Sequence, residues 1–281
     1  MTQDKLTLLS AVVQAAINDM DTFLPFMEAA KQAARRAKAE RLIRPLELKL
    51  RKAFKAQAVR FVRKLSSMRG KFAESLKPSD WQTAWFDAEE ATLKLFSDPV
   101  EAAVAKSLGI GALANIAELG LKMSWNLKNP RAVAYLDNYG AELVKGVNQT
   151  TRDALQVILS QAAEEGWSYQ RTAEAITERF AEFAVGRPQA HIDSRAHMIA
   201  VTEIGNAYVE GNLQVAQSLQ SSGIQMEKYW STVGDDKVSA SICAPNEAQG
   251  WIPLDEDFQS GDARPLGHPA CRCDLLTRVK E

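Results

Sequence analysis

Apolar residues recur every three or four positions through most of the chain, which is the spacing of helices with one buried face. The first such stripe runs from Leu6 to Met20, before Pro25 interrupts it. Residues 31–71 are also helical in pattern, and Pro45 predicts a break or kink there. Residues 1–160 are therefore expected to form a helical N-terminal region.

Capping residues predict where the next helices begin and end. Trp81 and Trp85 fall on one helix face, and we expect both to lie in the core. The apolar, glycine-bearing segment 108–120 predicts either tight packing or a subunit contact. The predicted boundaries are a cap at Ser79 with Gln82 in the capping-box position, a cap at Asn129, a start within residues 148–151, a stop at Gly166 and a cap at Ser168.

The pattern changes in the C-terminal third of the chain. A helix is predicted over residues 193–221, with an apolar stripe from Ala196 to Leu219. Beyond Gly223, three short segments have strand-like residues, and Pro253 implies that the second lies at an edge or in a loop. The predicted fold class is α+β and predominantly helical. A small C-terminal domain of helix and antiparallel sheet is expected over residues 161–281.

Composition excludes several classes of protein. The 281 residues are 46% hydrophobic and 25% charged, which is ordinary for a globular protein. No segment resembles a signal peptide, and no apolar stretch approaches the roughly 20 residues that span a bilayer. Three cysteines do not make a disulfide framework. We therefore expect a protein of the cytosol, or one assembled from it, with no membrane contact.

Charge is distributed unevenly along the chain. Residues 31–71 contain 15 Lys or Arg and two acids, Glu40 and Glu47, although the whole chain has a net charge of -1. Such a basic arm on an acidic body predicts contact with nucleic acid or an acidic protein, and a solvated helix face is the alternative. The candidate contact residues are Arg35, Arg36, Lys38, Arg41, Arg51, Lys52, Lys55, Arg60, Arg63 and Lys64.

The segment "HPACRC" gathers His268, Cys271 and Cys273 within six positions. Cys243, the remaining cysteine, lies 25 residues upstream of His268, far enough for a loop to return. Three thiolates and one imidazole would complete a closed tetrahedral zinc site. The alternative is a reduced, partly buried group of cysteines beside a histidine.

Several segments resemble, in order, the phage Mu F-type minor head proteins of the phage head morphogenesis domain family. They are "EEGWSYQRTAEAI", "SRAHMIAVTEIGNAY", "YWSTVGDDKVSASIC", "GWIPLDEDF" and "PLGHPACRC". The resemblance covers about residues 165–281, and the family's motif positions are Thr202, Glu203, Trp230, Asp235 and Asp236. Val201 stands where many members have arginine, and Ser239 and Ser241 stand where many have a cysteine or histidine. The fourth ligand could therefore be Cys243, Asp236 or a water.

The resemblance implies a structural, non-enzymatic role in the tailed-phage head. Its implied partners are portal and capsid proteins and double-stranded DNA, in the virion or, during assembly, in the host cytoplasm. Two alternatives remain open from the residues themselves. One is a zinc hydrolase or toxin-like enzyme that uses Glu203, His197, Asp236 and a metal-bound water. The other is a free-standing DNA-binding protein that uses the basic arm.

Overall fold

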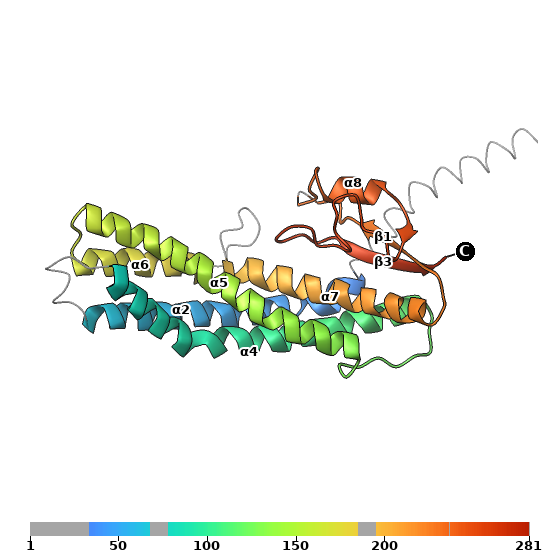
Figure 1. Cartoon of the computed structure of the whole chain (residues 1–281), viewed down its shortest axis with the longest axis horizontal. Helices are drawn as coiled ribbons and strands as arrows, with labels where there is room; N and C mark the ends of the chain where they lie inside the picture. The colour runs from blue at the N-terminus through green and yellow to red at the C-terminus, as the bar shows by residue number, and fades with distance from the viewer. Residues whose placement is uncertain (1–33, 68–77, 185–194, 236, 281) are drawn as a thin grey trace, which may run out of the picture.

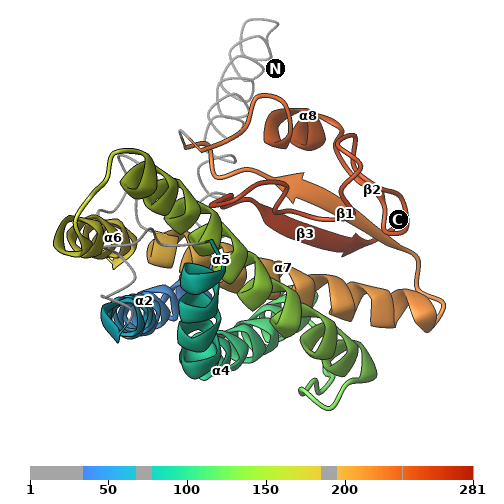
Figure 2. The ribbon, with the colours of Figure 1, turned by 60° about the vertical axis from the view of Figure 1, so that its left-hand side comes forward.

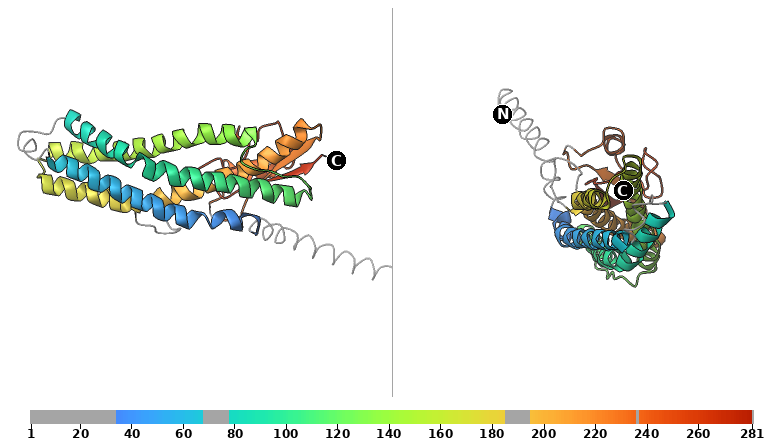
Figure 3. Two further views of the ribbon diagram at one scale, coloured as in Figure 1. Left: turned by 90° about the horizontal axis from the view of Figure 1, so that it is seen from below. Right: turned by 90° about the vertical axis from the view of Figure 1, so that its left-hand side faces the viewer.

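The computed structural model describes residues 34–67, 78–184, 195–235 and 237–280 (Figure 1). Within these ranges the protein is predominantly helical with a small antiparallel sheet, which confirms the predicted α+β class. The long helices lie side by side in an elongated bundle, and the sheet lies toward one end (Figures 1 and 3). The stripe from Leu6 to Met20 lies outside the described residues.

The basic stretch forms a short helical segment over residues 34–40 and then α2 (Ile43–Ser67). The break falls at residues 41–42 rather than at Pro45, because proline is tolerated in the first turn of a helix. The apolar face of α2 packs against α4 (Pro78–Glu118). Phe61 meets Trp85 edge to face at 5.8 Å between ring centroids. Trp81 and Trp85 are both buried, as the sequence predicts.

The closest helix contact joins α4 to α7 (Arg195–Ser221). A Cβ on Gly111 would lie 1.9 Å from the Tyr208 carbonyl oxygen, and a Cβ on Gly211 would lie 2.1 Å from that of Leu108. Only glycine allows the two backbones to approach so closely. Tight packing is thus the role of the segment 108–120 within the chain. The hydroxyl of Ser107 adds a hydrogen bond of 2.8 Å to the Ile204 carbonyl.

The helices α5 (Pro130–Glu164) and α6 (Tyr169–Ala184) are joined by a short turn. As predicted, Asn129 caps α5, Gly166 follows its end with a φ of +62°, and the Ser168 hydroxyl accepts from Arg171 N at 3.2 Å. The helix start predicted within residues 148–151 is wrong, because α5 runs through them without a break. Cap-forming residue types permit a helix start, but they do not stop a helix that is already formed.

The sheet contains β1 (Met226–Ser231), β2 (Ile252–Pro253) and β3 (Asp274–Val279) in the order β2–β1–β3, all antiparallel. Pro253 lies in an edge strand, as expected. The short helix α8 (Cys243–Ala248), which the sequence pattern did not predict, packs against β1. Figure 2 shows the sheet along one side of α7, with α8 farther out. This arrangement brings α8 near the loop that leads into β3.

One buried apolar cluster extends from Ala39 to Leu275 and so crosses the predicted domain boundary at residue 160. The basic helices and the C-terminal sheet therefore share a core. The boundary itself stays a prediction.

The sequence pattern predicts no membrane-spanning segment, but the helix α4 is long and apolar enough to be one. Over Trp81–Glu118 it has the length and composition to cross a bilayer, with a mean hydropathy of 1.3 in one 18-residue window. Of that window, 44% is buried inside the protein. The core helix of a globular protein has the same properties, and the packing of α4 on α2 and α7 accounts for its apolar character.

Candidate metal centre

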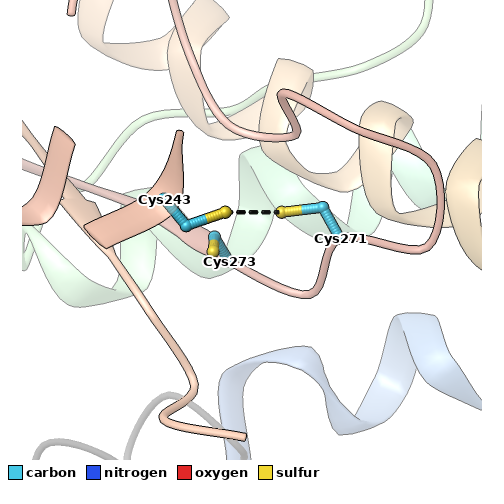
Figure 4. A group of neighbouring side chains, drawn as sticks. All are labelled: Cys243, Cys271 and Cys273. Carbon is cyan, nitrogen blue, oxygen red and sulfur yellow. Dashed lines mark hydrogen bonds between the residues drawn. The ribbon is translucent and has the colours of Figure 1, made fainter. Parts of the chain in front are cut away.

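The three cysteines converge from two segments that are separate in the sequence. Cys243 begins α8, whereas Cys271 and Cys273 lie on the loop before β3. Their sulfur atoms all lie within 4.8 Å of one another, and the Sγ atoms of Cys243 and Cys271 are 3.8 Å apart (Figure 4). All three side chains are buried, and none forms a disulfide. The structure thus brings together the three cysteines that the sequence proposed as ligands.

His268 approaches the same group through its Nε2 atom, which lies 3.2 Å from the Cys243 Sγ. The other ring nitrogen, Nδ1, lies 3.0 Å from the Pro269 carbonyl oxygen. A carbonyl oxygen only accepts hydrogen bonds, so Nδ1 must be the protonated nitrogen. In the neutral ring this leaves the lone pair of Nε2 on the side of the thiols, as a metal ligand requires.

The donor set fits a tetrahedral metal ion. Zinc–thiolate bonds of about 2.3 Å in a tetrahedron place two sulfur atoms about 3.8 Å apart. The distance between Cys243 and Cys271 is 3.8 Å. Sulfur and imidazole nitrogen are also donors that bind zinc in preference to magnesium or calcium. The three close cysteines could therefore bind a metal ion, with His268 beside them.

The thiols differ in acidity because they share hydrogen bonds. The hydrogen bond with Cys273 lowers the pKa of Cys271 to about 6, against the effect of burial, and His268 favours the same direction. The same hydrogen bond raises the pKa of Cys273, and burial raises that of Cys243. Cys271 is thus the thiol whose ionisation this arrangement favours. A thiolate is the form that binds metal.

The long helix α7 positions the loop that bears these ligands. The Thr202 hydroxyl accepts a hydrogen bond of 3.0 Å from the backbone N–H of Ala270. Ala270 has a φ of +59°, a conformation that L-residues rarely adopt and that reverses the chain just before Cys271. Thr202, one of the family's motif positions, therefore holds the backbone of the loop that carries Cys271 and Cys273 (residues 268–273, the cysteine loop).

The other motif residues surround the loop and the sheet. Glu203 is buried on α7, and Trp230 is fully buried in β1, with its ring edge to face with Phe258 at 5.2 Å. Asp235 accepts from Lys237 N at 3.0 Å and lies 3.4 Å from Arg272. Asp236, one of the candidates for a fourth ligand, lies outside the described residues. Of the described candidates, Cys243 lies beside Cys271 and Cys273, and its Sγ is 3.2 Å from the Nε2 of His268.

Residues 34–40 cover the cysteine loop from another side. Arg36 is 5% exposed and donates from Nη1 to the carbonyl oxygens of Arg272 and Cys273, the second at 2.7 Å. Burial raises the pKa of the adjacent carboxyl group, Asp274, and the positive charges of Arg35 and Arg36 oppose that shift. The sequence analysis missed this role, because 236 residues separate Arg36 from Arg272.

Because of these contacts, fewer of the predicted contact residues lie on the surface. Arg36 faces the interior, and the Arg35 side chain, 13% exposed, pairs with Glu118 at 2.6 Å. Neither side chain is presented to a partner on the surface. Lys64 pairs with Asp87 of α4 and is partly screened. The remaining predicted contacts are exposed: Lys38, Arg41, Lys52, Lys55, Arg60 and Arg63, with Lys49 as a residue that the sequence analysis omitted.

Arg51 belongs to a buried cluster around Glu47 rather than to that surface. Glu47 pairs with Arg51 and Arg44 of α2, and its Oε2 lies 3.1 Å from the Nδ1 of His197 on α7. Burial alone would raise the pKa of Glu47, but the hydrogen bond from His197 and the nearby charges lower it overall. His197 is thus a partner of Glu47 and ties α2 to α7. In the enzyme alternative it was a catalytic candidate.

Comparison with known proteins was informative for the C-terminal part of the chain. Residues 153–276 match the model of the family described as phage Mu protein F like protein. No curated protein and no solved structure gives a significant match to the chain. The matched range contains all four candidate metal ligands and begins within α5. The resemblance to the phage Mu F-type head proteins that the sequence predicts is therefore confirmed over residues 153–276.

Proposed function

We propose that this protein is a minor structural component of a tailed-phage head that acts in assembly at the portal vertex. The observation that supports the proposal is the family domain over residues 153–276. Its partners would be portal and capsid proteins, and it would reside in the virion after assembly in the host cytoplasm. Its cysteine cluster has the donors of a closed structural metal site rather than the open position that catalytic zinc needs.

Portal association is tested by co-expressing the full chain with the portal protein of the same phage. We expect a complex of fixed stoichiometry in size-exclusion chromatography and native mass spectrometry. For comparison, the chain is co-expressed in the same way with the major capsid protein in place of the portal protein. If the portal and this chain elute separately at micromolar concentrations, the placement at the portal is wrong.

We further propose that the ion at the cysteine cluster is zinc, held by Cys243, Cys271, Cys273 and His268. The four donors come from α8 and from the loop before β3, and zinc would link them to each other. Because such a site does not exist in the unfolded chain, the free energy of zinc binding would stabilise the fold. The role of the metal would then be structural.

The exposed face of α2 is a candidate contact for packaged DNA. Five cations, Lys49, Lys52, Lys55, Arg60 and Arg63, lie within about 140° of the helix circumference and about 21 Å of its length. Within the described part of the chain these five form no ion pair, and the only acid of α2, Glu47, is buried. Double-stranded DNA carries a phosphate about every 1.7 Å of axis, so one duplex could engage all five cations. Exposed Leu48 and Val59 favour the portal as the alternative partner of this face.

Substitution of four of these cations tests the DNA contact. In the variant K52Q/K55Q/R60Q/R63Q, we expect duplex affinity to fall and the slope of log affinity against log salt to lose about one for each charge removed. The control variant K94Q/K106Q/K122Q changes exposed lysines outside α2 and should bind as the wild type does. Duplex binding that is absent, or that does not depend on salt, would favour the portal as the partner.

A further inference from the structure

The cysteine loop is enclosed by a segment that lies outside the family domain. Residues 34–40 precede α2 by a short turn, more than one hundred residues before the match begins at residue 153. Nevertheless, Arg36 of this segment is buried against the loop, with its guanidinium 5.9 Å from the ring centroid of Tyr208 on α7. A Cβ on Gly205 would lie 3.4 Å from Arg36 Nη2, so α7 leaves space for the guanidinium at this position.

We propose that Arg36 is a positioning residue of the metal centre, so that metal binding at the cysteines and docking of residues 34–40 stabilise each other. The inference rests on the metal site proposed above, and it adds a residue that supplies no ligand atom.

Arg36 holds the backbone on both sides of Cys273. Arg36 donates to the carbonyl oxygens of Arg272 and Cys273, which are consecutive residues of the Cys-x-Cys segment. Fixing both carbonyls fixes the two peptide planes that flank Cys273, and hence the direction of the Cys273 thiol. On the other side of the loop, Thr202 holds the N–H of Ala270. The ligand segment is thus held at both ends, and one of the two supports comes from the N-terminal region.

The positive charge of Arg36 also lies beside a site that would be negative with its metal bound. Three thiolates and a neutral imidazole around a divalent ion would leave one net negative charge at this buried site. The side chain of Asp274, which directly follows Cys273, is also buried. An uncompensated buried charge is strongly unfavourable. Arg35 and Arg36 are the cations that act on Asp274, and both come from the segment 34–40. Glu40 of the same segment lies 3.6 Å from Arg272 and adds an exposed contact.

Docking of residues 34–40 and metal binding are thus linked thermodynamically. If docking of residues 34–40 strengthens metal binding, then metal binding must strengthen docking by the same factor. A partner that draws residues 34–40 away from the loop would weaken the metal site. Conversely, loss of the metal would loosen the attachment of the basic arm to the C-terminal domain.

The test compares Arg36→Gln with Arg41→Gln in the full chain. Glutamine at position 36 retains polarity but loses the charge and the paired donation, whereas Arg41 is exposed and serves as the matched control. Zinc affinity is measured by competition with a chromophoric chelator. We expect Arg36→Gln to bind zinc about 10–100-fold more weakly, the usual effect of losing an outer-shell partner, and Arg41→Gln to match the wild type.

Hydrogen exchange provides a second readout. In the wild type, zinc should slow amide exchange in residues 34–40 as well as in 268–276, and in Arg36→Gln the protection of 34–40 should be lost. If Arg36→Gln does not fold, Arg36→Lys keeps the charge with one donor group and should give an intermediate affinity. Equal zinc affinity in all variants would overturn the coupling and leave the metal site intact. A wild type that binds no zinc would overturn both.

Discussion

Removal of the metal is expected to lower the melting temperature of the protein by about 10 °C. Free zinc at a thousand times its Kd stabilises the folded state by about 4 kcal/mol, which corresponds to a shift of this size in a domain of about 200 residues. The physical reason is that zinc would join α8 to the loop before β3, where the three cysteines already converge. Differential scanning calorimetry with zinc, and with a chelator such as EDTA, measures the shift.

Substitution of a single metal ligand should lower the melting temperature by the same amount. Cys271→Ser is expected to reduce bound zinc from one ion per chain to almost none, and its melting temperature should no longer depend on EDTA. Ser241→Ala changes an exposed side chain two residues before Cys243 and should respond to zinc and EDTA as the wild type does. If the melting temperature of the wild type is the same in zinc and in EDTA, the cysteine cluster is not a structural metal site.

Gly111→Ala is expected to destabilise the protein by at least about 3 kcal/mol, at the upper end of the cost of overpacking. The added Cβ would lie 1.9 Å from the backbone oxygen of Tyr208, so α4 and α7 would have to move apart. A flexible side chain could rotate away from such a clash, but a helix backbone cannot. Their separation would also disturb the hydrogen bonds of Ser107 and Asn115 to carbonyls of α7. Urea unfolding followed by circular dichroism measures the change.

Gly109→Ala is the matched control because it lies two residues away in the same helix. A Cβ there would meet only Trp125 Cζ3 at 3.6 Å, an ordinary contact. Since alanine favours helix over glycine by up to about 1 kcal/mol, Gly109→Ala should be neutral or slightly stabilising. A stability of Gly111→Ala within about 0.5 kcal/mol of the wild type would contradict the close helix contact, since changes that small are typical of surface substitutions.

Elements whose signals are local could be predicted from the sequence. The apolar stripe of α7, the Asn129 cap and the strand at β1 each depend on residues within a few positions of one another. By contrast, the continuous α5 was divided wrongly, because capping residue types within a helix look the same as those at its start. The six-residue helix α8 was missed, because it is too short to give a periodic signal.

The candidate site divides in the same way. His268, Cys271 and Cys273 were found because they are neighbours in the sequence, and Cys243 was found because it is the one remaining cysteine. Arg36 was assigned to an external contact because its charge resembles that of the cations around it. Its actual neighbours, the carbonyl groups of Arg272 and Cys273, lie more than two hundred residues away and carry no side-chain signal. Only the folded chain reveals this pairing.

Quantitative mass spectrometry of purified phage particles and proheads tests the proposed role as a head protein most directly. The abundance of this chain is compared with that of the portal and major capsid proteins from the same phage. We expect a low and constant number of copies per portal, retained through purification. Complete absence of the chain from both proheads and mature particles would contradict the role in the head.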